Sequence, residues 1–187
     1  MKGNFYERLN LIKTRLASPE LLNNSGLGNE IGFYIFDYPP DEELAVRSHL
    51  EKILPEIPRK IAVVNLFELV IDYFKKRKIL DSAINTQIQK GDAEILRVVK
   101  GALDEEKRIA PEFIDAARPH EHDLVIMTGV GSVYPLLRTH RLINCLHPLM
   151  DDTPLIVFYP GSYNGQTLSL FGELKDENYY RAFRLVA

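Results

Sequence analysis

One strand-to-helix junction of this chain has the residue types that can bind an anion. It is the stretch "TGVGSVYP" (128–135), where closely spaced glycines could turn backbone N–H groups toward a phosphate. The dinucleotide-binding fingerprint needs a third glycine, and Tyr134 stands in its place. We also expect Ser132 to be the N-cap of a helix over 132–150, with Pro135 in its first turn. The candidate anion-binding residues are Gly129, Gly131 and Ser132.

A second junction, "DYPPDEEL" (37–44), lies where nucleotide-binding α/β domains hold phosphates. Pro39 and Pro40 remove two N–H donors, and the acidic residues 41–43 already occupy the positive end of the helix that follows. No G-x-x-x-x-G-K-[ST] motif occurs anywhere in the chain. The pattern favours helix capping and compensation of the helix dipole over a phosphate site.

The remaining chemically active side chains do not form a recognisable catalytic or metal-binding pattern. His120 and His122 form one pair and His140 and His147 another, but nothing in the sequence brings the pairs together as zinc requires. Cys145 lies in the middle of a predicted helix, which favours an unreactive thiol. We therefore expect no catalytic residue, no metal and no cofactor.

The C-terminal segment "NYYRAFRLVA" (178–187) combines aromatic residues with arginine. These side-chain types dominate the energetic centres of protein interfaces, and they also suit a last strand that completes a sheet. The candidate partner-binding residues are Tyr180, Arg181, Phe183 and Arg184.

The elements that must position these residues alternate between strands and helices. Continuous apolar runs predict strands at 31–38, 60–66, 123–129, 154–161 and 167–172. Amphipathic patterns predict helices over 4–16 (Phe5, Leu9, Ile12 and Leu16 buried), over 41–54 (Leu44, Leu50 and Leu54 inward), and throughout 67–118 (a stripe of Phe67, Val70, Ile71 and Phe74). This order predicts one α/β domain over 1–187: a three-layer Rossmann-like or degenerate P-loop-like fold with a mainly parallel sheet, a C-terminal hairpin and a helical insertion at 79–118.

The last two predicted strands are too close in sequence for a parallel crossover. Pro160-Gly161 stands at the end of the first and Asn164-Gly165 lies between them, and both dipeptides favour turns. We expect a hairpin here rather than a loop that binds a ligand.

Composition limits the class of protein. The 187 residues are 45% hydrophobic and 26% charged, as in ordinary globular domains. The net charge of -3 gives no overall field that would attract nucleic acid. With one cysteine, no signal-peptide pattern and no long apolar run, we expect a soluble cytoplasmic protein without a membrane partner.

The stretches "FYPGSYNGQTLSLFG" and "DENYYRAFRLV", together with "HDLVIMTGVGSVYPLLRTHRLINCL", resemble the BrxB family of bacteriophage exclusion (BREX) defence systems. The resemblance extends through essentially the whole chain. It implies an antiviral defence component that is encoded with a methyltransferase, an ATPase and the alkaline-phosphatase-like PglZ protein. It implies no established catalytic residue.

The resulting hypothesis is a non-catalytic adaptor of a BREX complex whose partners are other BREX proteins, most directly PglZ. One alternative is a nucleic-acid- or nucleotide-sensing domain that uses Gly129 to Ser132 or Lys75 to Lys78. In the adaptor hypothesis, by contrast, this protein would contact nucleic acid only indirectly, through other members of the complex. Another is an unrecognised enzyme, with Asp37 and Ser162-Tyr163 as strand-end candidates. Oligomeric state is not predicted by the sequence.

Overall fold

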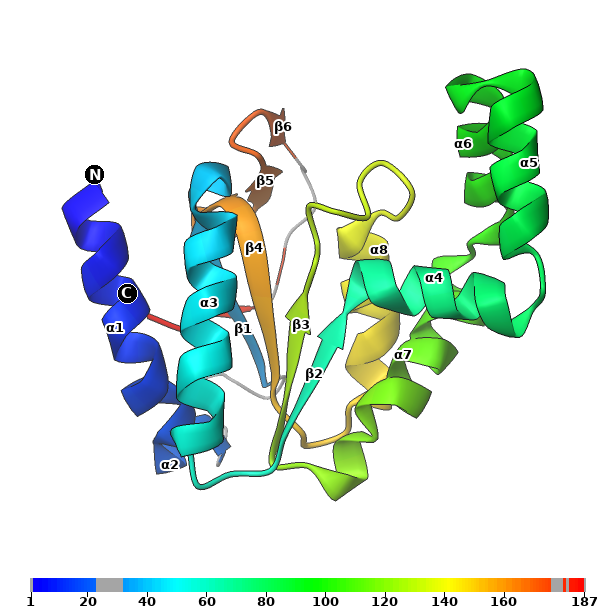
Figure 1. Ribbon diagram of the computed structural model, residues 1–187. Coiled ribbons are helices and arrows are strands. Elements are labelled where there is room, and N and C mark those ends of the chain that lie inside the picture. The colour runs from blue at the N-terminus through cyan, green and yellow to red at the C-terminus, as the bar shows by residue number, and fades with distance from the viewer. Residues whose placement is uncertain (1, 23–31, 176–179, 181, 187) are drawn as a thin grey trace.

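The computed structural model describes residues 2–22, 32–175, 180 and 182–186. Its centre is a mainly parallel sheet in the order β2-β3-β4-β1-β7 (Figure 1). These strands are β1 (Phe33–Tyr38), β2 (Ile61–Asn65), β3 (Leu124–Thr128), β4 (Leu155–Tyr163) and β7 (Phe183–Arg184). Two antiparallel strands, β5 (Leu168–Leu170) and β6 (Leu174–Lys175), continue from β4. The predicted mainly parallel α/β class is confirmed.

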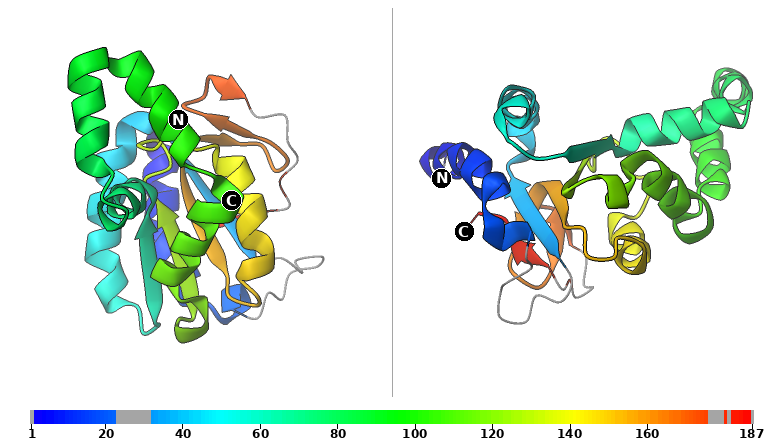
Figure 2. Two further views of the ribbon diagram at one scale, coloured as in Figure 1. Left: turned by 90° about the vertical axis from the view of Figure 1, so that its right-hand side faces the viewer. Right: turned by 90° about the horizontal axis from the view of Figure 1, so that it is seen from below.

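Helices cover both faces of the sheet, which gives three layers (Figure 2). One face carries α1 (Lys2–Ala17), α2 (Pro19–Leu22) and α3 (Glu43–Ile53); the other carries α4 (Leu66–Lys76), α7 (Ala110–Ala117) and α8 (Thr139–Leu146). Single 3-10 turns are η1 (Pro40–Glu42), η2 (Leu54–Glu56), η4 (Pro119–Glu121) and η5 (His147–Leu149). Along β1, Tyr34 and Phe36 pack toward the first group of helices, and Phe33 and Ile35 toward the second. Burial on both faces is the reason that β1 and β3 are continuous apolar runs. The edge strand β2 differs, because Val63 is 49% exposed.

The helical insertion between β2 and β3 has two parts that differ in packing. After α4, the helices α5 (Leu80–Lys90) and α6 (Asp92–Ala102) form an antiparallel pair, the α5–α6 hairpin, which projects from the body (Figure 1). A π-helical turn, η3 (Glu105–Ile109), and α7 then return to the sheet, where Ile109 and Phe113 are fully buried. The insertion therefore projects over one part of its length and packs down over the other.

The predicted C-terminal hairpin is present, with its turn at one of the two expected dipeptides. Strands β4 and β5 are antiparallel. The side chain of Asn164 accepts hydrogen bonds from the N–H groups of Gln166 and Thr167, and Gly165 has a φ of 95°. The predicted turn at Pro160-Gly161 is wrong, because both residues lie inside extended β4, where the Pro160 carbonyl accepts from Phe171 N–H.

Three local expectations are corrected. The helix predicted from residue 132 begins at Thr139, because residues 129–137 form consecutive turns in which N–H groups bond to carbonyls of the same loop. Leu44, expected inward, is 76% exposed at the first turn of α3. Phe67, expected in the buried stripe of α4, is 42% exposed, and Leu66 takes its place in the core. By contrast, Phe5, Leu9, Ile12 and Leu16 of α1 are all buried, as expected.

None of the helices formed by the described residues has the length and apolar character needed to cross a bilayer.

Candidate functional site

The carboxyl end of β1 contains a buried carboxylate between two guanidinium groups. Asp37 is 7% exposed, and its Oδ1 lies 2.6 Å from Nη2 of Arg8 on α1 and 3.2 Å from Nη1 of Arg184 on β7. Its Oδ2 accepts a hydrogen bond from Tyr163 N–H on β4 at 3.0 Å. The Asp37 cluster, defined as Asp37, Arg8, Arg184 and Tyr163, thus joins the first helix, the sheet and the C-terminal segment.

The geometry of the Asp37 cluster limits the chemistry of its carboxylate. Both oxygens already accept charge-assisted or backbone hydrogen bonds, so neither is available as a general base or a metal ligand without breaking an ion pair. A guanidinium N–H of Arg184 also donates to the Tyr163 carbonyl. A cavity of about 680 Å³ lies beside the cluster and is lined by Asn4, Phe5, Arg8, Asp37, Tyr38, Pro39, Gly161 and Arg184. In this lining, two guanidinium groups flank the carboxylate of Asp37, and the acidic residues 41–43 are not part of it.

The acidic residues that follow β1 bind neighbouring side chains rather than capping the helix. Neither η1 nor α3 has a side-chain cap hydrogen bond at its start, so the predicted capping role is wrong. Glu42 instead accepts from the Tyr6 hydroxyl, and Glu43 accepts from the Tyr38 hydroxyl and from Arg47 Nε. Burial, with the Glu43 carboxylate, raises the pKa of Tyr38, so that its hydroxyl remains a donor. These contacts bind α1 and α3 to the sheet.

The glycine loop after β3 is shaped by packing against its neighbours. Gly129 has a φ of 73°, and a Cβ there would lie 2.3 Å from Oδ1 of Asn65, which is the N-cap of α4. A Cβ at Gly131 would lie 3.0 Å from the rings of Phe171 and Pro160. The N–H groups of Ser132, Val133 and Tyr134 donate to carbonyls within the loop. Close packing thus explains why glycine occupies positions 129 and 131. The anion site at Gly129, Gly131 and Ser132 stays a prediction.

The structure gives the candidate partner-binding residues different environments. Tyr180 is 4% exposed, and its N–H donates to the Gln166 carbonyl. Phe183 is 39% exposed on β7, which pairs with β1 in parallel, whereas Arg184 belongs to the Asp37 cluster. Arg181 lies outside the described residues. Of the described candidates, Phe183 is the aromatic residue with an exposed side chain, and the partner-binding role stays a prediction.

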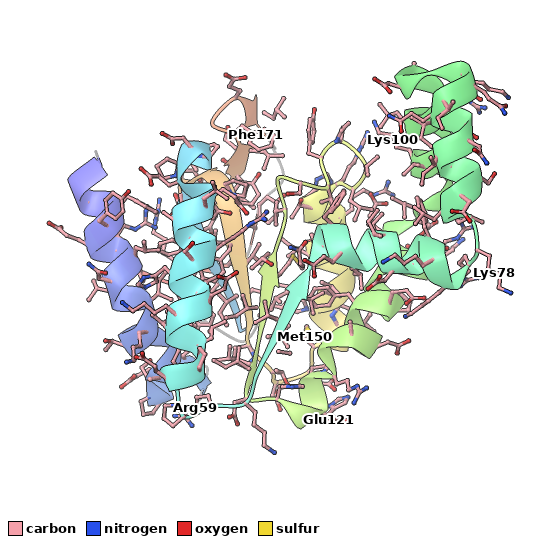
Figure 3. All side chains as sticks on the ribbon, viewed as in Figure 1. Arg59, Lys78, Lys100, Glu121, Met150 and Phe171 are labelled. Atoms are coloured by element: carbon pink, nitrogen blue, oxygen red, sulfur yellow. The ribbon has the colours of Figure 1, made fainter. Side chains whose placement is uncertain are left out.

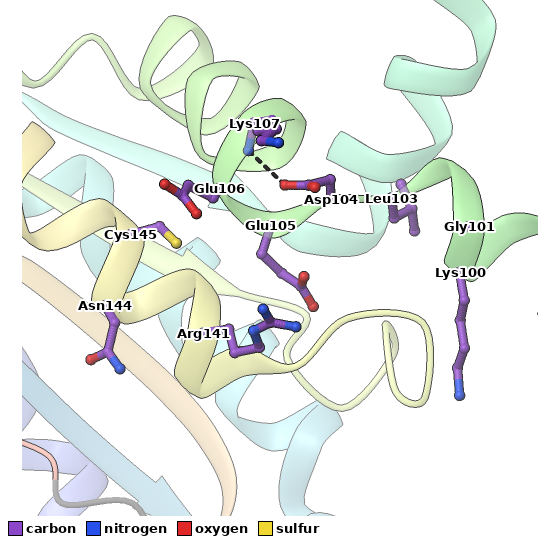
Figure 4. Close-up of a pocket in the computed structure, with 10 residues that line it drawn as sticks. All are labelled: Lys100, Gly101, Leu103, Asp104, Glu105, Glu106, Lys107, Arg141, Asn144 and Cys145. Atoms are coloured by element: carbon purple, nitrogen blue, oxygen red, sulfur yellow. Dashed lines mark hydrogen bonds between the residues drawn. The ribbon is translucent and has the colours of Figure 1, made fainter.

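A second cavity, of about 570 Å³, lies between η3, α8 and the end of α6 (Figure 4). Its acidic residues, Asp104, Glu105 and Glu106, line it together with Lys100, Lys107, Arg141 and Cys145. The Asp104 carboxylate accepts from Lys107 N–H at 2.7 Å, which lowers the pKa of Asp104 and caps η3. Burial, with Glu106 and Glu105, raises the pKa of Cys145, so the thiol is a poor nucleophile.

Comparisons with known proteins decide the family. The family model described as "BREX protein BrxB" matches residues 62–185. A BREX protein BrxB of Bacillus cereus (strain H3081.97) is 38% identical over 187 residues, covering 96% of each chain. A BREX protein BrxB of Escherichia coli O9:H4 (strain HS) is 39% identical over 181 residues, covering 96% of this chain and 90% of that protein. No solved structure matches the chain.

The chain belongs to the BrxB family. The resemblance inferred from the sequence is confirmed, and the protein is a component of a BREX phage-defence system that acts with other BREX proteins. In this BrxB-family chain, the matched region begins in β2 and ends just after β7, so it includes the α5–α6 hairpin and the whole lining of the 570 Å³ cavity. Of the residues that line the 680 Å³ cavity, it includes Gly161 and Arg184.

No group of histidine, cysteine, aspartate and glutamate suited to a metal ion occurs within 2–22 and 32–175 or among the other described residues of this BrxB-family chain. His120 lies 3.7 Å from the carboxylate of Asp151, an exposed pair at the end of the molecule opposite the Asp37 cluster. In the basic run at the end of α4, Lys75 pairs with Asp72 and Lys76 with Glu112. Both lysines remain largely exposed, and a nucleic-acid contact through Lys75 to Lys78 stays a prediction.

Sequence reasoning missed Arg8 and Tyr163 as partners of Asp37. Arg8 lies 29 positions from Asp37 in the sequence and Tyr163 lies 126 positions away, so no local spacing links them. A usable signal was present nonetheless. An aspartate inside an apolar strand is expected to be buried, and a buried carboxylate requires a cationic or hydrogen-bonding partner. The arginine of an amphipathic helix that covers the sheet was a candidate for that partner.

Proposed function

We propose that this protein is a non-catalytic adaptor of the BREX complex and that it contacts PglZ through the α5–α6 hairpin. Membership of the BrxB family supports a role among other BREX proteins. The observation that carries the adaptor role is the hairpin itself, which projects from the body (Figure 1). Its helices expose apolar side chains.

The two helices of the hairpin both carry exposed apolar side chains. Ile88 is 76% exposed, Ile84 is 46% exposed one turn earlier on α5, and Val98 of α6 is 40% exposed. The described residues of α5 include none that is fully buried, and the buried residue of α6 is Val99. Apolar groups grouped on a projecting element favour a protein contact, because burial against a partner removes them from water.

The C-terminal segment supplies a second contact in this proposal. Phe183 presents an aromatic ring beside the ring of Tyr34, with centroids 6.3 Å apart, while Arg184 holds β7 to the body through Asp37. The predicted partner-binding role of Tyr180, Arg181, Phe183 and Arg184 therefore rests mainly on Phe183. Tyr180 and Arg184 would position this edge rather than bind the partner.

The test is co-purification of PglZ from the same BREX system with affinity-tagged full-length protein. Ile88→Glu places a charge on the proposed contact and should lower PglZ recovery by at least about tenfold. Leu44→Glu is the matched control, because Leu44 is also 76% exposed but lies on α3 of the body. Its recovery of PglZ should equal that of the wild type.

Phe183→Ala tests the C-terminal contact and should reduce recovery less than Ile88→Glu. Equal recovery with Ile88→Glu, Leu44→Glu and wild type would remove the hairpin from the proposal. If the wild-type protein recovers no PglZ at all, the choice of partner is wrong.

A further inference from the structure

A third cavity opens at the carboxyl end of the sheet, on the face opposite α1 and α3. It has a volume of about 350 Å³ and lies between the loop after β3, the β4–β5 hairpin and the end of α6. Its chemically distinctive residues are Lys100, Tyr134, Arg138, His140, Tyr159 and Tyr180. Ligands of open α/β sheets bind at this edge, beyond the carboxyl ends of the strands.

The described residues that line this cavity have charge of one sign. Lys100, Arg138 and His140 are the basic groups among them, and they include no aspartate or glutamate. The Glu105 carboxylate accepts from the backbone N–H of Arg138 at 3.1 Å and lines the neighbouring cavity. The two cavities described earlier differ in this respect, because one includes the Asp37 carboxylate and the other includes three acids. Lys100 and Arg138 are both exposed, so their charges can reach a ligand from solvent. Figures 3 and 4 show Lys100 on the part of α6 next to this loop. An anion is the ligand class that this lining favours.

Tyrosine rings add a second recognition element. Tyr134 is 46% exposed, and its ring meets Phe171 edge-on at a centroid distance of 6.0 Å. This contact holds the ring in place while nearly half of the residue surface stays open. Aromatic rings of this kind stack on nucleobases irrespective of base identity.

We propose that this cavity binds a free nucleoside phosphate, with the phosphate between Lys100 and Arg138 and the base against Tyr134. Lysine and arginine are the side chains that bind phosphate most often, arginine through two parallel hydrogen bonds. The cavity volume lies within the range of small-molecule sites. The loop that suggested an anion site in the sequence thus contributes Tyr134 and Arg138 rather than its glycines. This ligand is additional to the adaptor role and does not depend on it.

The experiment is isothermal titration calorimetry of the purified full-length protein with ATP and with AMP. Lys100→Glu and Arg138→Glu should each weaken binding by about tenfold or more, and Tyr134→Ala should weaken it by about fivefold. Lys90→Glu is the control, because Lys90 is an exposed lysine of the same hairpin that does not line the cavity. Its affinity should match that of the wild type. Raising the salt concentration should weaken binding to the wild type, because phosphate contacts are screened.

Absence of ATP and AMP binding would overturn the proposal, as would equal losses in Lys90→Glu and Lys100→Glu. A parallel titration uses a 5′-phosphorylated single-stranded oligonucleotide. Binding of the oligonucleotide without binding of ATP or AMP would also overturn it, because the ligand would then be a nucleic-acid strand. Circular dichroism of each variant verifies that the fold is retained.

Discussion

Helix α7 and the α5–α6 hairpin belong to the same helical insertion, yet the apolar side chains of α7 are buried and several of those of the hairpin are exposed. In α7, Ala110, Phe113 and Ala117 are completely buried against the sheet face. In the hairpin, Ile84, Ile88 and Val98 remain open to solvent. An amphipathic pattern therefore predicts that one face of a helix will be buried. It does not predict whether that face packs against the same chain or against a partner protein.

The same contrast holds for charge at the carboxyl end of the sheet. Asp37 is surrounded by cations of its own chain, which makes its cluster part of the architecture. Lys100 and Arg138 are exposed and line a cavity whose described lining residues include no aspartate or glutamate. Side chains that pair with other residues of the chain should determine the free energy of unfolding. Side chains that remain exposed to solvent should determine the affinity for ligands and partners.

Phe113→Ala should have the largest effect on stability. The side chain is fully buried between α7 and the sheet, and its removal should cost about 3–5 kcal/mol of the free energy of unfolding. Urea denaturation followed by circular dichroism measures this loss. Phe113→Leu retains most of the volume and should lose less; equal losses would show that α7 is not packed as described.

Asp37→Ala should be the next most destabilising change. It removes the carboxylate between Arg8 and Arg184 and leaves the Tyr163 N–H without its acceptor, a loss of about 3 kcal/mol. Asp37→Asn keeps an oxygen acceptor and should be intermediate in the same denaturation experiment. Glu94→Gln, which breaks an exposed pair with Arg97, is the control and should leave the transition unchanged. A transition in Asp37→Ala that matches the wild type would refute the architectural role of the cluster.

The rate of Cys145 alkylation by iodoacetamide should show a pH midpoint above that of an ordinary thiol. Burial and the nearby Glu106 and Glu105 carboxylates disfavour the thiolate, so the pKa is raised and the reaction at neutral pH is slow. Replacing both glutamates by glutamine should lower the midpoint part of the way, since burial remains. A midpoint that the double variant leaves in place would exclude the carboxylates as a cause.

Ile88→Ala should have the smallest effect on stability, because the residue is already 76% exposed in the isolated protein. The free energy of unfolding should change by less than about 0.5 kcal/mol, while PglZ recovery should fall. Urea denaturation and co-purification on the same preparation test both expectations. If Ile88→Ala lowers the free energy of unfolding but leaves PglZ recovery unchanged, then Ile88 contributes to the packing of the hairpin and not to a partner contact.

Local patterns in the sequence determined the type and order of most elements. Continuous apolar runs located β1 to β4, and β1, β3 and β4 have no polar side over most of their length because they are covered on both faces. In β2, Val63 is 49% exposed, so the apolar run there does not mean burial on both faces. Asn164-Gly165 located the turn of the β4–β5 hairpin, because its geometry depends only on adjacent residues. Family membership could likewise be inferred from the text of the chain, and the comparisons confirm it.

Only the tertiary structure decided which side chains meet and which surfaces stay open. Arg184 reaches Asp37 across 147 positions of sequence because β7 lies beside β1, and no periodicity encodes that contact. The exposure of Leu44 and Phe67 likewise depends on where α3 and α4 begin relative to the sheet. Burial and ion pairing depend on which residues are neighbours in three dimensions. A local sequence pattern can therefore predict that a residue needs a partner, but it cannot predict which residue that partner is.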